Sequence, residues 1–142
     1  MFNLDDCFAL ITSRSGKIFA KKLDEQLSSH GTPRTQWIAM YYIYTSDKIT
    51  QKGLADKMQI KEPTVARMLQ KMELDGLLSR DSNAKDKRIK SLKLTDKGSK
   101  EFFRLLPIVE NFKDNTISDI SDQDLDTFKK VLNKMIENTI NS

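Results

Sequence analysis

The chain has 142 residues, of which 38% are hydrophobic and 31% charged. This length fits a single domain with a real core, and no apolar run approaches the roughly 18 residues that span a bilayer. Asp5 and Asp6 occupy the region where a signal peptide needs basic residues, so we expect a cytoplasmic protein. One cysteine and one histidine leave no Cys/His cluster for zinc, and we expect no metal or other cofactor.

Positive charge is concentrated in the middle of the chain. Residues 57–104 contain 13 Lys/Arg and 7 Asp/Glu, a net charge of +6, whereas residues 105–142 contain 4 and 7, a net charge of −3. A basic middle with an acidic end indicates a polyanionic partner for the middle only. A solvated charged surface is the alternative.

Apolar residues recur at close to helical spacing over residues 1–29, which predicts a first helix there. Gly31 and Pro33 end it, because Gly suits a helix end and Pro restarts the chain. A second helix is predicted through residues 37–43.

Two further helices follow, separated by a tight connector. Thr50 can cap a short helix that reaches Met58. The next helix is predicted over residues 62–76, where Pro63 is tolerated in the first turn and Gly76 ends the helix.

The periodicity then changes from helical to extended. Residues 77–80 and 89–94 are predicted to be strands, and the polar, turn-rich residues 81–88 lie between them. This pattern predicts a β-hairpin with a long basic tip.

The C-terminal part returns to helical periodicity. Thr95 can cap a fifth helix, in which Pro107 is expected to produce a kink. Ser121 and Asp124 resemble a capping box at the start of a last amphipathic helix.

This order of elements predicts a mainly α-helical winged helix-turn-helix fold with a small β-hairpin wing. The longer helix would lie in the major groove, which is about 12 Å wide. Arg67 can donate two hydrogen bonds to guanine, Gln70 can pair with adenine, and the Thr64 methyl can contact a thymine methyl. The polar and apolar split of this helix is also expected of any surface helix.

The expected wing tip strengthens the DNA-binding interpretation. Lys85, Lys87 and Arg88 cluster there with only Asp86 among them. A thin basic loop can enter the narrow minor groove, although a solvated loop is the alternative. The residues expected to contact double-stranded DNA are Thr50, Gln51, Lys61, Glu62, Pro63, Thr64, Ala66, Arg67, Gln70, Lys71, Lys85, Asp86, Lys87 and Arg88.

The sequence resembles the MarR (multiple antibiotic resistance regulator) family over nearly its whole length. The matching stretches are ITQKGLADKMQIKEPTVARMLQKMELDGLLSR, DKR at the wing tip and LKLTDKG. The resemblance implies a transcriptional regulator, with Arg88 reaching the minor groove and Asp86 orienting Arg67. The family commonly has Ser, Asp or Asn capping the recognition helix, and this chain departs from it with Lys61 and Glu62.

We expect one MarR-like domain over residues 1–142. Residues 32–104 would form the DNA-binding lobe, and residues 1–30 and 105–142 would form dimerisation helices. The first and last helices carry more apolar surface than a small lobe can cover, and a two-fold dimer would bury it and read a palindromic operator. An intramolecular core is the alternative. The expected dimer residues are Phe2, Leu4, Phe8, Ile11, Phe112, Phe128, Leu132, Met135 and Ile136.

The resemblance also implies a small-molecule effector. MarR-like proteins often sense small aromatic or phenolic acids in a crevice beside the DNA-binding lobe, so we expect a repressor that such a ligand releases. Ordinary core packing of the aromatics and a solvated arginine are the alternative. The candidate lining residues are Arg14, Ile18, Trp37, Met40 and Tyr41.

Cys7 offers a different switch. The stretch DDCFALITSR resembles the first helix of the organic hydroperoxide regulators, a MarR branch with a sensing cysteine. That branch uses tyrosines near the cysteine, where this chain has Ile11 and Arg34 or Trp37. An inert buried thiol is the alternative to thiol-based redox sensing.

An enzyme is not expected. One His and one Cys do not assemble a catalytic arrangement, and nothing resembles a phosphate-binding glycine loop. A winged helix that binds protein rather than DNA remains a further alternative, and the basic wing argues against it.

Overall fold

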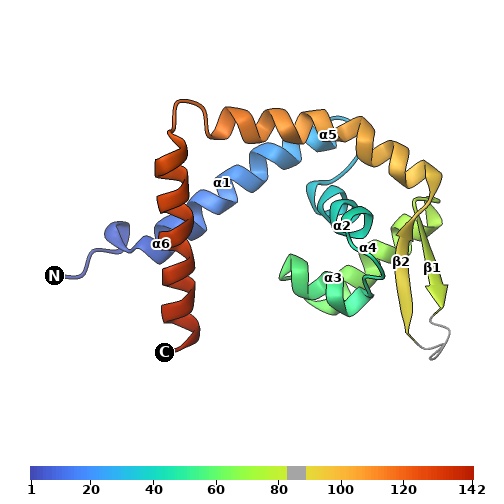
Figure 1. Ribbon diagram of the computed structural model, residues 1–142, viewed down its shortest axis with the longest axis horizontal. Coiled ribbons are helices and arrows are strands. Elements are labelled where there is room, and N and C mark those ends of the chain that lie inside the picture. The colour runs from blue at the N-terminus through green and yellow to red at the C-terminus, as the bar shows by residue number, and fades with distance from the viewer. Residues whose placement is uncertain (83–88) are drawn as a thin grey trace. The chain divides into compact units, whose positions relative to one another are not determined.

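The computed structural model describes residues 1–82 and 89–142, and these residues form helices and one antiparallel hairpin (Figure 1). None of the helices in these two ranges is long and apolar enough to cross a membrane. The elements are α1 (Phe8–Ser28), α2 (Arg34–Thr45), α3 (Gln51–Met58), α4 (Glu62–Leu74), β1 (Leu78–Ser82), β2 (Lys90–Leu94), α5 (Asp96–Thr116) and α6 (Asp122–Ile140).

The chain divides into two compact units. The core unit comprises Lys22–Val109, and the terminal unit comprises Met1–Lys21 together with Glu110–Ser142. Helices α1 and α5 contribute residues to both. The predicted DNA-binding lobe, residues 32–104, falls entirely within the core unit.

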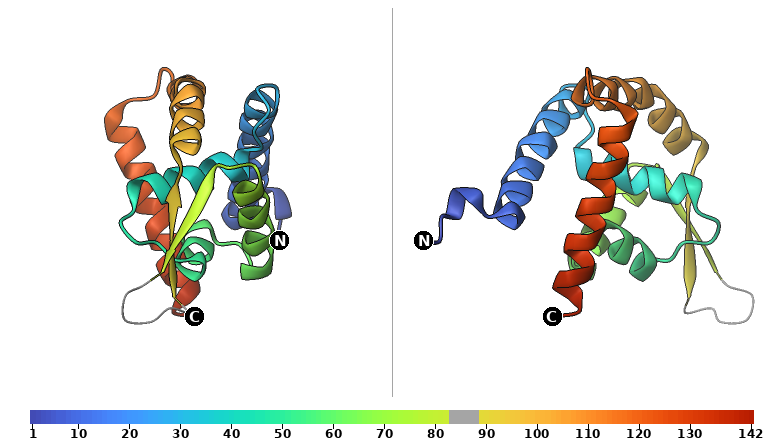
Figure 2. Two further views of the ribbon diagram at one scale, coloured as in Figure 1. Left: turned by 90° about the vertical axis from the view of Figure 1, so that its right-hand side faces the viewer. Right: turned by 60° about the vertical axis from the view of Figure 1, so that its left-hand side comes forward.

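Helices α2, α3 and α4 pack with the hairpin around the hydrophobic core of the core unit. Strands β1 and β2 run side by side (Figure 2). They pair in antiparallel register, with Leu78 opposite Leu94 and Arg80 opposite Leu92. The predicted winged helix-turn-helix, mainly α with a small hairpin, is therefore confirmed. The largest fully buried side chains are Leu27, Met40, Leu54, Val65, Leu69, Met72 and Leu105.

The helix-turn-helix is built by local capping. Thr50 caps α3, since its hydroxyl accepts the backbone N–H of Gly53 at 3.1 Å. Gln59 ends α3 in the left-handed conformation (φ 54°) and allows the tight connector. Helix α4 begins at Glu62 with Pro63 in its first turn, and its N-cap Lys61 provides no side-chain hydrogen bond.

Helix α2 is capped from a distant part of the chain. Its N-cap residue Pro33 has no side-chain acceptor, and the Asp24 carboxylate on α1 accepts the first helical N–H, that of Arg34, at 2.8 Å. A carboxylate at this position satisfies an otherwise unpaired donor and complements the helix dipole.

The start of α5 packs against the end of α4. Thr95 caps α5 by accepting the N–H of Gly98 at 3.0 Å, and its hydroxyl donates to the carbonyl of Gly76 at 2.6 Å. Gly76 itself has φ +76°, as expected of a glycine that ends a helix. Helix α5 then runs through Pro107 to Thr116.

A polar cluster ties the α1–α2 connection to α5. The Glu101 carboxylate accepts hydrogen bonds from Thr32 at 2.9 Å and from Arg104 at 2.6 Å. The Arg104 guanidinium also donates to the carbonyl of His30 at 2.9 Å. The hydrogen bond from Arg104 is the largest influence on Glu101, and it lowers the pKa of that carboxyl despite its partial burial.

The predicted first helix begins later than expected. Residues 4–6 form a 3-10 turn, because the Asn3 side chain accepts the N–H of Asp5 at 3.1 Å. Cys7 follows in an extended conformation, and its carbonyl accepts the N–H groups of Leu10 and Ile11 at the start of α1. Local side-chain capping therefore competes with the helical pattern of residues 1–7.

No residue of the terminal unit is buried in the single chain. Helix α6 is capped as expected, since Ser121 accepts the N–H of Asp124 at 3.1 Å, and it carries an apolar stripe. Large hydrophobic side chains of this unit remain exposed, namely Met1, Phe2, Leu4, Phe8, Leu10, Ile18, Phe19, Ile120, Phe128, Val131, Ile136 and Ile140.

Candidate nucleic-acid interface

Helix α4 presents one face to the core and the opposite face to solvent. Val65, Leu69 and Met72 are buried, whereas Arg67 and Gln70 are exposed. The exposed face is centred on Arg67, because Arg67 lies about 170° around the helix from the mean direction of the three buried residues. The side chains that could reach base edges are therefore available to a ligand.

The other predicted contacts on this helix are also accessible. Glu62, Pro63, Thr64 and Lys71 are exposed and Ala66 is half-buried, so each is accessible from solvent; Lys61, just before the helix, is exposed as well. Lys71 forms an exposed ion pair with Asp75 at 3.0 Å, four residues later. Such an exposed pair contributes little to stability and leaves the ammonium group able to exchange partners.

Two predicted contacts at the start of α3, its N-cap Thr50 and its first residue Gln51, are occupied by intramolecular hydrogen bonds. The Thr50 hydroxyl caps α3, as described above. The Gln51 amide donates to Glu62 Oε1 at 3.5 Å and accepts from Arg80 Nη1 at 3.4 Å. Both residues are half-buried, so each has a role inside the lobe whatever it contacts outside.

The wing tip is outside the described residues. Lys85, Asp86, Lys87 and Arg88 all fall within residues 83–88, so their predicted contacts and the expected pairing of Asp86 with Arg67 stay predictions. Both strands that lead into the wing are present, but β1 runs to Ser82, two residues further than the predicted strand, and β2 begins at Lys90, one residue later than predicted.

Arg80 is a candidate site residue that the sequence pattern did not single out. This arginine lies on β1, its Nε is 3.6 Å from Glu73 Oε1 on α4, and only 22% of its side chain is exposed. The signal was present in the strand pattern, since side chains two residues apart point to the same face and Leu78 is buried. Arg80 therefore points into the lobe rather than toward solvent.

The candidate ligand residues are divided between the two units, with Trp37, Met40 and Tyr41 in the core unit. Met40 is fully buried and Trp37 nearly so, with its indole N–H donating to the carbonyl of Phe102 at 3.3 Å. Both are core residues, which matches the alternative of ordinary packing. Tyr41 is 43% exposed, and Arg14, in the terminal unit, forms an exposed ion pair with Asp5 at 3.7 Å.

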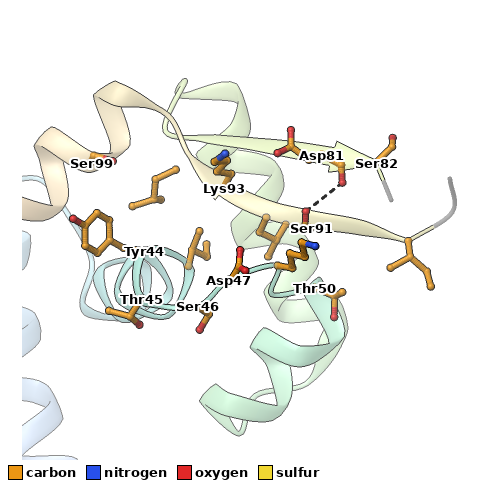
Figure 3. Close-up of a pocket in the computed structure, with 15 residues that line it drawn as sticks. Tyr44, Thr45, Ser46, Asp47, Thr50, Asp81, Ser82, Ser91, Lys93 and Ser99 are labelled. Carbon is orange, nitrogen blue, oxygen red and sulfur yellow. Dashed lines mark hydrogen bonds between the residues drawn. The ribbon is translucent and has the colours of Figure 1, made fainter. Parts of the chain in front are cut away.

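Ile18, the remaining candidate, is exposed on the part of α1 that belongs to the terminal unit. The structure has a groove elsewhere, of about 890 Å³, which none of the five candidates lines. Figure 3 shows it between the end of α2, where Tyr44 lies, and strand β2, where Ser91 and Lys93 lie. Two of the lining residues are hydrogen-bonded across the hairpin, since the Ser91 hydroxyl donates to the carbonyl of Asp81 at 3.4 Å (Figure 3).

Cys7 is half-buried at the residue before α1. Over residues 1–82 and 89–142, no group of three or more His, Cys, Asp or Glu side chains is arranged to hold a metal ion. The redox interpretation of Cys7 stays a prediction.

Comparisons with known proteins agree with this geometry. Residues 33–90 match the model of the MarR family. The chain is similar to the uncharacterized HTH-type transcriptional regulator YwoH of Bacillus subtilis, with 27% identity over 125 residues, covering 88% of this chain and 90% of that protein.

Solved structures give the same result. The crystal structure of the S. aureus MepR–DNA complex matches with a TM-score of 0.79 and 25% identity, covering 97% of this chain and 99% of that one. The transcriptional regulator PA3341 matches with a TM-score of 0.85 and 25% identity, covering 95% and 99%. Residues 33–90 therefore form a MarR-family domain, and the chain has the winged helix-turn-helix fold of MarR-like transcriptional regulators over nearly its whole length.

Proposed function

We propose that this protein binds double-stranded DNA sequence-specifically and places α4 in the major groove. The observation that carries the proposal is the exposed polar face of α4, centred on Arg67 and backed by a buried apolar stripe. The net charge of +6 over residues 57–104 supports attraction to phosphates. The MepR structure, similar in sequence and fold, is a complex with DNA.

A selection of binding sites from random duplexes tests this proposal. The wild-type chain should enrich a defined sequence, and its affinity should fall steeply as salt increases, because bound phosphates release counterions. If no duplex is retained even in dilute buffer, the proposal is wrong.

We propose that the functional form is a homodimer. The terminal unit has no buried side chain in the single chain, yet it exposes apolar residues on both α1 and α6. Such faces are unfavourable in water, and a second copy would cover them by two-fold symmetry. A two-fold dimer would read a palindromic operator with half-sites about one helical turn, roughly 34–36 Å, apart.

We propose further that the DNA-bound protein represses transcription, and that binding of a small aromatic acid releases the protein from the DNA. Support comes from an aromatic cluster on α2 and α5, in which Tyr44 stacks on Phe102 at 5.0 Å and on the edge of Phe103 at 5.1 Å. Tyr41, Tyr44 and Phe103 are each close to half exposed, so planar ligands have rings to stack on.

Calorimetric titration with salicylate tests this part of the proposal. Heat of binding together with release of the selected duplex is the expected result. An absence of heat, or heat without any change in DNA affinity, would count against an aromatic acid as the effector.

A further inference from the structure

Arg80 connects the wing strand to the predicted recognition helix. Its Nε lies 3.6 Å from Glu73 Oε1 on α4, and its Nη1 donates to Gln51 Oε1 at 3.4 Å on α3. The same Gln51 amide donates to Glu62 Oε1 at 3.5 Å. One guanidinium therefore reaches two carboxylates of α4, one directly and one through an amide.

The two carboxylates hold α4 at both of its ends. Glu62 is the first residue of the helix, and Glu73 is the next to last. Eleven residues apart, they fall about 20° from each other around the axis and about 16 Å from each other along it. The two contacts, Arg80 with Glu73 and Gln51 with Glu62, are the ties of α4. Both ties lie on one flank of the helix, between its buried stripe and its exposed face.

Two ties on one flank resist rotation of the helix about its own axis. A buried stripe of apolar side chains tolerates small rotations, because its contacts are not directional. A guanidinium is directional, since its planar fork fixes the geometry of the partners that it binds. Rotation of α4 decides where the Arg67 side chain points relative to a base edge.

Arg80 is poorly placed to contact DNA itself. It shares the inward face of β1 with buried Leu78, and only 22% of its side chain is exposed. Its donors face Glu73 and Gln51. Because of this inward orientation, Arg80 is not expected to contact a DNA phosphate, the role that a solvent-exposed basic residue beside the wing would have.

We infer that Arg80 is a positioning residue that sets the rotation of α4 and so determines DNA specificity without touching DNA. The inference rests on the proposed function. The loss of Arg80 should therefore lower the specificity of DNA binding without removing a phosphate contact.

The test measures the dissociation constants for a selected duplex and for a scrambled duplex at several salt concentrations. The ratio of the two constants is the specificity, and the dependence on salt counts the phosphate contacts. Arg80→Met should lower the specificity about tenfold, comparable with the loss of one base-pair contact, and leave the salt dependence unchanged. Arg80→Lys should also lower it, because the ammonium group lacks the fork.

Lys90→Met is the matched control. It removes one positive charge from the same hairpin at an exposed position, opposite Ser82 in the register. Its specificity should equal that of the wild type. A loss as large as that of Arg80→Met would overturn the inference, because the effect would then follow from charge alone.

Glu73→Gln provides a second variant in case Arg80→Met does not fold. Glu73 is on the surface, with 46% of its side chain exposed, so its substitution spares the core. It should lower the specificity less than Arg80→Met does, and should have no further effect in a chain that already lacks Arg80. If Arg80→Met is unfolded and Glu73→Gln has the same specificity as the wild type, the inference is overturned.

Two other results overturn the inference. One is a specificity that Arg80→Met leaves unchanged. The other is an equal loss of affinity for both duplexes with a salt slope reduced by about one, which would make Arg80 a phosphate contact. If the wild type selects no duplex, the proposed function fails and the inference falls with it, so the two failures are distinguishable.

Discussion

Gly98, in the first turn of α5, lies directly against the main chain of Leu77, and a Cβ built on this glycine would overlap the Leu77 carbonyl oxygen. The same carbonyl accepts the N–H of Thr95 at 3.1 Å, so the turn after α4 and the start of α5 are held together. Gly98→Ala should lower the free energy of unfolding by about 1–3 kcal/mol, because backbone has to move to admit the methyl group. Chemical denaturation measures the change.

Gly16→Ala is the control for this prediction. A Cβ at Gly16 meets no atom within 4 Å, and the residue lies inside α1. Alanine in a helix is favoured over glycine by about 0.5–1 kcal/mol, so this variant should be as stable as the wild type or more so. If Gly98→Ala behaved in the same way, the close approach of the two segments would be wrong.

Arg67 should contribute directly to DNA recognition. Arg67→Ala should weaken binding to the selected duplex by about 1–3 kcal/mol and weaken binding to a scrambled duplex less, because a base contact is lost. Fluorescence anisotropy with labelled duplexes gives both affinities. Lys129→Ala, which removes one positive charge from an exposed position on α6, should leave the difference between the two duplexes unchanged.

Thr50 should stabilise the helix-turn-helix through its hydroxyl. Thr50→Val keeps the shape of the side chain but removes the acceptor for the Gly53 N–H, and it should cost about 1 kcal/mol of unfolding free energy. Thr50→Ser keeps the hydroxyl and should retain most of that energy. Equal stabilities of the two variants would show that the cap is not a stabilising contact.

The ion pair of Glu101 with Arg104 should make stability depend on pH in the acidic range. The hydrogen bond from Arg104 lowers the pKa of Glu101 in the folded state, so its stabilisation is complete above the pKa of the unfolded state, about 4.3. It is lost as the pH falls through the lower pKa of the folded state. The wild type should exceed Glu101→Gln in stability at pH 7, and the difference should shrink at pH 3.

Denaturation at the two pH values measures this difference. In a chain that carries Arg104→Met, the difference in stability between Glu101 and Glu101→Gln at pH 7 should be smaller, because Arg104 is the first cause of the lowered pKa. A difference between wild type and Glu101→Gln that stays constant from pH 7 to pH 3 would contradict the assignment.

The apolar face of α6 should hold the proposed dimer together. Leu132 lies four residues from both Phe128 and Ile136, so the three share one face of the helix. Leu132→Lys should shift the protein toward monomer in sedimentation at micromolar concentration, because an ammonium group would have to be buried. Asn133→Lys, at the neighbouring exposed position, should remain dimeric; a wild type that is already monomeric would remove the proposal.

Features decided within a few residues could be predicted from the sequence. Thr50, Thr95 and Ser121 each cap a helix through a backbone N–H only three residues away. The burial of Val65 and Leu69 follows from helical periodicity, which requires one apolar face. The order of helices and strands, and with it the winged helix-turn-helix, follows from such local signals.

The places of single aromatic and basic residues depend on packing between elements distant in the chain. Trp37 and Met40 were candidates for a ligand crevice, yet they are in the core, because an amphipathic helix does not reveal which neighbour will cover it. The sequence pattern predicts Arg80 only as the end of a strand, although the burial of Leu78 two residues earlier directs its side chain inward.

By itself, the sequence determined the elements, their caps and the polar face of α4, since each depends on contacts between residues near in the chain. Only the tertiary structure decided that Asp24 caps α2, that Arg80 joins β1 to α4, and that Gly98 has to lack a side chain beside Leu77. Asp24 is 10 positions from the N–H that it accepts, and Gly98 is 21 positions from Leu77. Arg80 is only seven positions from Glu73, but the two residues belong to different elements. Their geometry depends on how whole elements pack, and no periodicity along the chain encodes it.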